Sequence, residues 1–256
     1  MILKYKELEV FYSVEGTGNA IVLLHGFLEN STMWKDIVKE LSIKNKVVCI
    51  DLLGHGKTSC QGYIHTMEDM AVVVKEVLRE LRLRKVIIIG HSMGGYVGLA
   101  FAEKYPENLK GLCLLNSTSQ ADSEERKELR LRAIQMAQTN YKALVSMSIT
   151  NLFALETRNQ FSKEIEILKE EALQIPVQGY IAATHGMRER TNRENVLFSI
   201  QKKLLIAGEN DPILPFESVR KEALKTKTPL QILPNGHMSH IETKEELITV
   251  LKNFVK

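Results

Sequence analysis

The chain has 256 residues, and its 34 basic and 31 acidic side chains give a formal net charge of +3. So small an excess does not indicate a nucleic-acid-binding protein, and no basic cluster is interleaved with aromatic residues. No apolar run approaches the roughly 18 residues that a bilayer-spanning helix needs. With 44% hydrophobic residues, the sequence favours one large globular domain, and we expect neither nucleic acid nor a membrane as a partner.

The three cysteines are an odd number, which argues against a disulfide framework. Cys49 and Cys113 fall within apolar runs, where we expect them to act as small hydrophobic core residues. The N-terminal residues become polar within a few positions and lack the apolar core of a signal peptide. We therefore expect a reduced, cytoplasmic protein, and the sequence leaves its oligomeric state open.

Short apolar runs alternate with helical patterns through the first half of the chain. Two strands are expected within residues 3–14, and further strands at residues 20–24, 46–50, 86–89 and 110–115. Helices are expected from about Met33, over residues 67–81, and directly after Ser92. This alternation is typical of right-handed β-α-β units, so it predicts a mostly parallel sheet with helices on both faces.

The pattern breaks between residues 117 and 199, where no convincing strand occurs. Residues at helical spacing form stripes there instead, namely Tyr141, Leu144, Val145, Ser148 and Leu152, and then Phe161, Ile165, Leu168 and Ala172. About eighty residues is too long for an ordinary connection between strands. We expect a separate helical layer, and the alternative is that these helices simply flank the sheet.

The pentapeptide GHSMG at residues 90–94 follows the apolar run at residues 86–89. It has the form G-x-S-x-G at a point where a buried strand ends and a helix begins, which presents the serine hydroxyl at the tip of a strained turn. The two glycines leave room for that turn and for the helix packed beside it. Ser92 is therefore the candidate nucleophile. The alternative is that it only caps the following helix.

A serine nucleophile needs a base, and the base needs an acid that orients it, here in the chain order serine, acid, histidine. The apolar run at residues 203–207 predicts a strand, and a loop with Glu209 and Asp211 follows it. Loops that follow parallel strands lie at one edge of the sheet, where ligands bind. Asp211 is the expected acid and Glu209 the alternative. Asp51 precedes the serine, so we expect it to fix its own loop.

The last predicted strand, at residues 230–233, ends in a turn that leads to Gly236 and His237. Gly236 permits a sharp exit from the strand, which would bring His237 to the same edge of the sheet as Ser92. His237 is therefore the expected base. His240 competes for this role, although its position just before the last helix favours packing or capping.

Four segments together resemble the α/β-hydrolase superfamily almost from end to end. They are LLHGF at residues 23–27, DLLGHGKTS at 51–59 (with Leu53 where proline is common), GEND at 208–211 with Pro215, and GH at 236–237 with Glu242. The resemblance implies an eight-stranded, mostly parallel sheet flanked by helices, with a helical cap inserted after the sixth strand. Residues 117–199 would form that cap, and residues 1–116 and 200–256 the hydrolase core.

The resemblance also implies the chemistry of the site. Ser92, Asp211 and His237 would form a triad that cleaves small-molecule carboxylic esters through an acyl-enzyme on the serine. The oxyanion hole would consist of the main-chain N–H groups of Phe27 and Met93. No cofactor and no metal are expected, since the sequence holds no zinc-type histidine or cysteine spacing and no nucleotide-binding glycine motif.

Two other functions stay open at this point. The chain also resembles capped hydrolases that break carbon–carbon bonds and menaquinone-pathway synthases that perform eliminations, both on carboxylate-bearing substrates. The cap holds several arginines that could bind such a carboxylate, including Arg158, Arg188, Arg190 and Arg193, and the alternative is that most of them are solvated surface charges. The third reading is a ligand-binding protein that uses the hydrolase fold without turnover.

Overall fold

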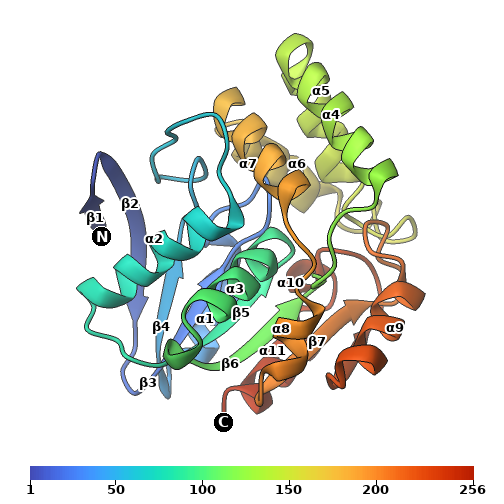
Figure 1. The fold of residues 1–256 in the computed structure, drawn as a ribbon. Coiled ribbons are helices and arrows are strands. Elements are labelled where there is room, and N and C mark those ends of the chain that lie inside the picture. The colour runs from blue at the N-terminus through green and yellow to red at the C-terminus, as the bar shows by residue number, and fades with distance from the viewer.

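The computed structural model describes residues 1–256 as an eight-stranded sheet covered by helices on both faces (Figure 1). The strands are β1 (Ile2–Tyr5), β2 (Leu8–Glu15), β3 (Asn19–Leu24), β4 (Asn45–Ile50), β5 (Val86–His91), β6 (Leu109–Leu115), β7 (Lys203–Gly208) and β8 (Leu230–Leu233). Each lies where an apolar run predicted a strand. The α/β-hydrolase architecture expected from the sequence is therefore confirmed.

The strands follow the order β1-β2-β4-β3-β5-β6-β7-β8 across the sheet. Strand β2 is antiparallel to both of its neighbours. The six strands β3 to β8 are parallel to one another. The carboxyl ends of β3, β5, β6, β7 and β8 consequently meet at one edge of the sheet. In open parallel sheets this edge is where ligands bind.

The helices are α1 (Lys35–Leu41), α2 (Met67–Glu80), α3 (Met93–Lys104), α4 (Glu124–Thr139), α5 (Tyr141–Thr150), α6 (Ser162–Ala172), α7 (Val177–Glu189), α8 (Glu194–Ser199), α9 (Phe216–Thr226), α10 (Ser239–Glu242) and α11 (Lys244–Phe254), with 3₁₀ turns η1 (Ser31–Trp34) and η2 (Pro106–Asn108). The helix expected from about Met33 is thus η1 followed by α1. The side chain of Asn30 accepts the Thr32 N–H and caps η1.

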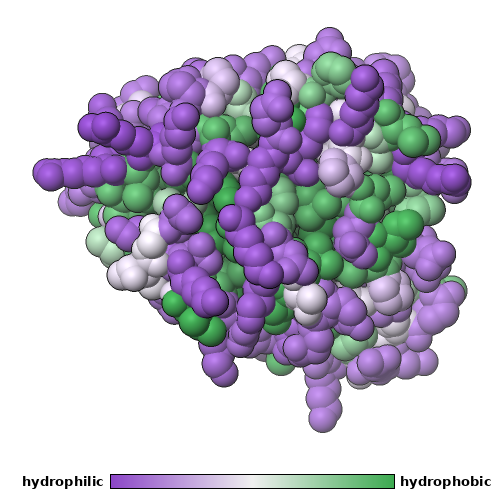
Figure 2. Space-filling model, turned by 90° about the horizontal axis from the view of Figure 1, so that it is seen from below, coloured by the Kyte–Doolittle hydropathy of each residue, from purple (hydrophilic) through white to green (hydrophobic).

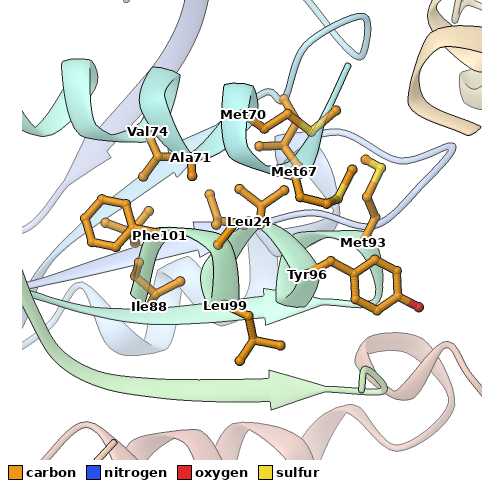
Figure 3. Packing of buried hydrophobic residues seen from close by; sticks show 14 of the residues in the cluster. Leu24, Met67, Met70, Ala71, Val74, Ile88, Met93, Tyr96, Leu99 and Phe101 are labelled. Atoms are coloured by element: carbon orange, nitrogen blue, oxygen red, sulfur yellow. The ribbon is translucent and has the colours of Figure 1, made fainter. Parts of the chain in front are cut away.

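One face of the sheet packs against α2, α3, α8 and α9 through the largest group of buried apolar residues. Figure 3 shows Phe101 of α3 facing Val74 and Ala71 of α2, with Ile88 of β5 on its other side. All four of these side chains are fully buried. Their packing fixes α3, and therefore the turn at its N-terminus, relative to the sheet.

The opposite face of the sheet packs against α1 and α11. Trp34 is fully buried there and fixes η1 against the sheet. Cys49 and Cys113 are free, buried members of the same group. Burial raises the pKa of the Cys49 thiol to about 12, so this cysteine stays a neutral core residue.

The chain between β6 and β7 contains helices and no strand, as its residue pattern indicated. Helices α4 to α7 stand above the carboxyl edge of the sheet in the upper part of Figure 1. They share a separate apolar group in which Val145 (α5), Ile165 (α6) and Tyr180 (α7) meet Leu28 and Met238 from the core. Helix α8 differs from the others, because it packs beside α9 and α3.

None of the helices is both long and apolar enough to span a membrane. Figure 2 shows the face turned away from α4–α7, where long hydrophilic side chains project over smaller apolar patches.

Substituting Phe101 tests whether the α2–α3 face carries much of the stability. Phe101→Ala should lower the free energy of unfolding by about 3–5 kcal/mol, because it removes a fully buried ring and leaves a cavity. Phe198→Ala is the matched control, because that ring is 50% exposed, and its loss should be about 1 kcal/mol. Urea unfolding followed by circular dichroism gives both values. Equal losses would contradict the packing described here.

Candidate active site

Ser92 occupies the turn between strand β5 and helix α3. Its backbone angles, φ +47° and ψ −113°, lie where residues other than glycine are rarely found, so the turn is strained. Close packing makes the flanking glycines necessary: a Cβ atom on Gly90 would lie 2.3 Å from the carbonyl oxygen of Gly94. The Ser92 N–H donates to the carbonyl of Leu115 over 2.9 Å. The strained turn is therefore held by the neighbouring strand β6.

The expected acid and base meet at the same edge, after strands β7 and β8. Nδ1 of His237 lies 2.7 Å from Oδ2 of Asp211, and both side chains are buried. The N–H groups of Ile213 and Leu214 donate to the other carboxylate oxygen over 2.8 and 3.0 Å. Burial alone would raise the pKa of Asp211, but His237 and these N–H groups outweigh it and hold the pKa below its ordinary value. Asp211 is thus a carboxylate that orients the His237 ring.

Asn116 joins the loop after β7 that carries Asp211 (the acid loop) to the loop after β8 that carries His237 (the base loop). The sequence did not reveal this role. It follows β6 directly and has a left-handed φ of +44°. Its side-chain amide donates to Oδ2 of Asp211 over 3.1 Å and to the Gly236 carbonyl over 3.2 Å. Its Oδ1 accepts the Ser239 hydroxyl over 2.7 Å. The one available signal was its position at the end of a strand on the catalytic edge.

Ser92 and His237 line one cavity of about 280 Å³. Small-molecule sites span about 300–1,000 Å³, so this cavity suits a small substrate. A larger hollow of about 550 Å³ lies between β2 and η1 and contains none of the expected site residues. The smaller cavity is the candidate site, because Ser92 and His237 lie in its wall. No group of histidine, cysteine and acidic side chains is arranged to hold a metal ion.

The loop after β3 (the oxyanion loop) contains Phe27, the first of the two expected oxyanion donors. Phe27 lines the cavity, and its main-chain N–H donates to no acceptor within the protein. The N–H of Met93 begins helix α3, where the first N–H groups have no intrahelical acceptor. His25 has a structural role: Nε2 accepts the Leu52 N–H over 2.8 Å, and Nδ1 contacts the Gly26 carbonyl over 2.7 Å.

A buried ion pair, Glu29 with His91, lies directly beside these groups. Nδ1 of His91 is 2.6 Å from Oε2 of Glu29, and Nε2 is 3.0 Å from the carbonyl oxygen of His237. Both ring nitrogens therefore face acceptors, which favours the doubly protonated ring. Burial works against that charge, but Glu29 outweighs it, and the pKa of His91 is raised. The same Glu29 oxygen accepts the Gly26 N–H over 2.9 Å, so the pair connects the oxyanion loop to the base loop.

His240, the competing base, lies beside Glu29 and the His91 ring. Its Nε2 is 3.5 Å from Oε1 of Glu29, and it does not line the cavity that contains Ser92. Burial lowers the pKa of His240 to about 4, only partly opposed by Glu29. The structure thus brings His237, and not His240, to the acid and the cavity.

Glu242 fixes the base loop from both sides of His237. Its Oε2 accepts the N–H groups of Gly236 (3.2 Å) and Met238 (3.1 Å). Its Oε1 accepts the Ala154 N–H over 3.1 Å and the Thr157 hydroxyl over 2.6 Å. One buried carboxylate thus ties the base loop to the helical segment between β6 and β7.

Residues 19–244 match the alpha/beta hydrolase fold family. The chain belongs to this family. It is 30% identical to a thermophilic esterase from Thermogutta terrifontis, solved with malate bound, with a TM-score of 0.91 over 97% of this chain and 93% of that one. The family match and the similarity to this esterase both support a hydrolase as the class of this protein.

Other relatives in the alpha/beta hydrolase family carry different chemistries. The chain is 25% identical to 2-hydroxy-6-oxo-2,4-heptadienoate hydrolase of Pseudomonas putida, over 94% of this chain and 90% of that protein. It is 26% identical to a putative 2-succinyl-6-hydroxy-2,4-cyclohexadiene-1-carboxylate synthase of Bacillus subtilis, over 96% and 95%. Over 106 residues it is 33% identical to uncharacterised mycobacterial proteins, of whose length it spans 31%.

The four cap arginines that could bind a carboxylate have other partners in this structure. Arg190 packs over the Tyr96 ring and pairs with an aspartate, and Arg193 pairs with Glu68 and Glu103. The remaining two are bonded to their own segments, Arg158 to the Phe153 carbonyl and Arg188 to Glu189. None of the four lines the cavity with Ser92, whereas Arg126 and Arg130 do.

Replacing Glu29 tests the buried pair. Glu29→Gln should lower the free energy of unfolding at pH 7 by about 3–5 kcal/mol, because it leaves the His91 charge buried without its partner. His91 and the neighbouring histidines overcome the effect of burial and lower the pKa of Glu29 to about 2. A lowered folded-state pKa gives stability that is present above the unfolded value, near 4.5, and lost as the pH falls toward 2.

The deficit of Glu29→Gln should therefore shrink between pH 4.5 and pH 2. Urea unfolding across this range measures it, and exposed Glu209→Gln is the matched control. A deficit that is the same at every pH, or as small as that of the control, would rule out a charged Glu29 as the stabilising group.

Proposed function

We propose that this protein is a serine hydrolase that cleaves small-molecule carboxylic esters. The observation that carries the proposal is the buried contact of 2.7 Å between Asp211 and His237 at the cavity that Ser92 also lines. A serine on a strained turn, a histidine and an orienting carboxylate are the elements of nucleophilic acyl transfer. The esterase from Thermogutta terrifontis, at 30% identity, supports this choice within the family.

In the proposed mechanism, Nε2 of His237 takes the proton of the Ser92 hydroxyl as its oxygen attacks the ester carbonyl. Asp211 holds the imidazole in the required tautomer and stabilises its positive charge. The main-chain N–H groups of Phe27 and Met93 receive the negative charge that develops on the carbonyl oxygen. His237 then protonates the departing alcohol, and water, activated by the same ring, releases the acid from the acyl-enzyme.

We propose that residues 117–199 act as a cap over this site, on a core formed by residues 1–116 and 200–256. Support comes from the cavity wall, to which Arg130 (α4), Met147 (α5) and Met187 (α7) contribute. A wall made largely by these helices would set the size of the acyl or alcohol part that fits. The small cavity then favours short esters.

Carbon–carbon bond hydrolysis or elimination is the second candidate function. The hydrolase from Pseudomonas putida and the putative synthase from Bacillus subtilis, each aligned over most of their length, favour it. The two arginines in the cavity wall suit the carboxylate that such substrates carry. Binding without turnover is a weaker alternative, because no member of the proposed triad is missing.

Ester turnover is the direct test. With p-nitrophenyl esters from acetate to dodecanoate, the wild type should hydrolyse short chains fastest, because the cavity is small. Ser92→Ala should lower kcat by about 10⁴-fold or more without changing the thermal unfolding temperature. Mass spectrometry of the quenched wild type should reveal the acyl adduct on the peptide that contains Ser92. A folded wild type without activity beyond that of Ser92→Ala would reject the esterase proposal.

The identity of the base is tested by a pair of histidine variants. His237→Ala should reduce kcat nearly as much as loss of the serine, and Asp211→Asn by about 10³- to 10⁴-fold, because it stabilises the wrong tautomer. His240→Ala should cost less than about tenfold, since this ring contacts Glu29 and lies outside the cavity. Steady-state rates on the best ester give the comparison. If His240→Ala were the more damaging variant, the assignment would be wrong.

A further inference from the structure

The wall of the catalytic cavity contains two guanidinium groups that the ester mechanism does not use. Arg126 and Arg130 are four residues apart on α4 and therefore lie on the same face of that helix. Both line the cavity that contains Ser92 and His237. They also line a second hollow of about 300 Å³, which shares Phe27 and Ile213 with the first. Both guanidinium groups thus lie at the boundary between the catalytic cavity and the second hollow.

These arginines belong to a buried cluster that carries excess positive charge. Asp122, whose side chain is fully buried, pairs with Arg130, with Arg190 over 2.7 Å and with Arg126 over 3.6 Å. Three cations therefore surround one carboxylate. Arg190 is 96% buried and turned onto the Tyr96 ring, so it is not available to a ligand. Asp122 balances only one of the three charges, so the cluster keeps a net positive charge, and Arg126 and Arg130 are its members at the cavity wall.

Both arginines keep unused donors. Nε of Arg130 is bonded to Asp122, and its Nη1 makes only a weak contact of 3.6 Å with the sulfur of Met187. Nη1 of Arg126 donates to the Ile213 carbonyl over 2.9 Å. The Nη2 groups of both side chains donate to no protein acceptor. Side-chain exposures of 36% for Arg126 and 15% for Arg130 leave these groups open to solvent or to a ligand.

No acidic residue lines either hollow to balance this charge. The buried carboxylates nearest the site already have partners: Asp211 with His237, and Glu29 with His91. Excess positive charge in a partly enclosed site is costly unless an anion neutralises it. A planar guanidinium fork matches a carboxylate in two parallel hydrogen bonds.

We propose that the substrate of this enzyme carries a carboxylate group, held by Arg126 and Arg130, in addition to the ester bond presented to Ser92. The inference rests on the proposed function and adds the substrate class to it. Arg126 and Arg130 act as specificity determinants: they bind the anionic end and leave the bond cleavage to Ser92, His237 and Asp211. A neutral ester of the same shape leaves the remaining donors of both guanidinium groups without an acceptor and binds less well.

Two matched pairs of esters test the proposal. Monoethyl succinate and ethyl 4-methylpentanoate differ in the acid part, where a carboxylate replaces an isopropyl group. O-Acetylglycolate and isobutyl acetate differ in the same way in the alcohol part. A pH-stat at pH 7.5 measures kcat/KM for each. The wild type should prefer the anionic member of at least one pair by about tenfold or more.

Arginine variants show whether these side chains cause the preference. Arg126→Gln and Arg130→Gln should each lower the ratio of kcat/KM for the anionic over the neutral ester by about tenfold, mainly through KM. Arg130→Lys should restore part of the ratio, because it returns the charge without the fork. Arg132→Gln is the matched control, since Arg132 is exposed on the same helix and outside both hollows, and its ratio should equal that of the wild type.

A wild-type ratio near one in both pairs, or a ratio that neither glutamine variant changes, would overturn the proposal. Absence of turnover with all four esters would reject the ester function. Binding of a carboxylate by Arg126 and Arg130 is then tested separately. In that case, calorimetric titration of Ser92→Ala with succinate should give binding that Arg130→Gln weakens by at least about tenfold. No binding of succinate would overturn the anion site as well.

Discussion

The site depends first on the parallel alignment of β3, β5, β6, β7 and β8, because it brings their carboxyl ends to a single edge. Each of these strands delivers one component there: the oxyanion loop, Ser92, Asn116, the loop of Asp211 and the loop of His237. A displacement of one strand would move one component relative to the others. The buried apolar layers on both faces therefore position the chemistry as well as stabilising the fold.

Buried carboxylates then lock the loops that leave these strands. Glu29 connects the oxyanion loop, through His91, to the carbonyl of His237, while Glu242 holds the N–H groups on both sides of that residue. Asp51 does the same for the loop after β4, accepting the N–H groups of Ser31 and Lys57 over 2.8 Å each. A charge removed from water is tolerated only with such partners. The hydrogen bonds to these carboxylates offset the cost of burying their charge, and they hold each loop in one conformation.

The sequence was sufficient for the sheet and for the placement of Ser92, Asp211 and His237, because each depends on a local pattern: an apolar run followed by a turn. Asn116 and Glu29 escaped prediction for the opposite reason. Their partners lie 95 and 62 residues away, and no local pattern encodes such contacts. The sequence likewise could not tell which cap arginine lines the cavity, because this depends on how three cations share Asp122.

The two parts of the molecule thus have different tasks. Strand ends of the sheet hold every group assigned to bond cleavage, and helix α4 holds the charges assigned to substrate choice. Helix α4 has few buried residues, only Ile134 and Ala137, so its other positions can change at little cost in packing. The charge beside the site can therefore vary while the reacting groups stay fixed. A fold can in this way keep one set of reacting groups while the side chains beside the site select the substrate.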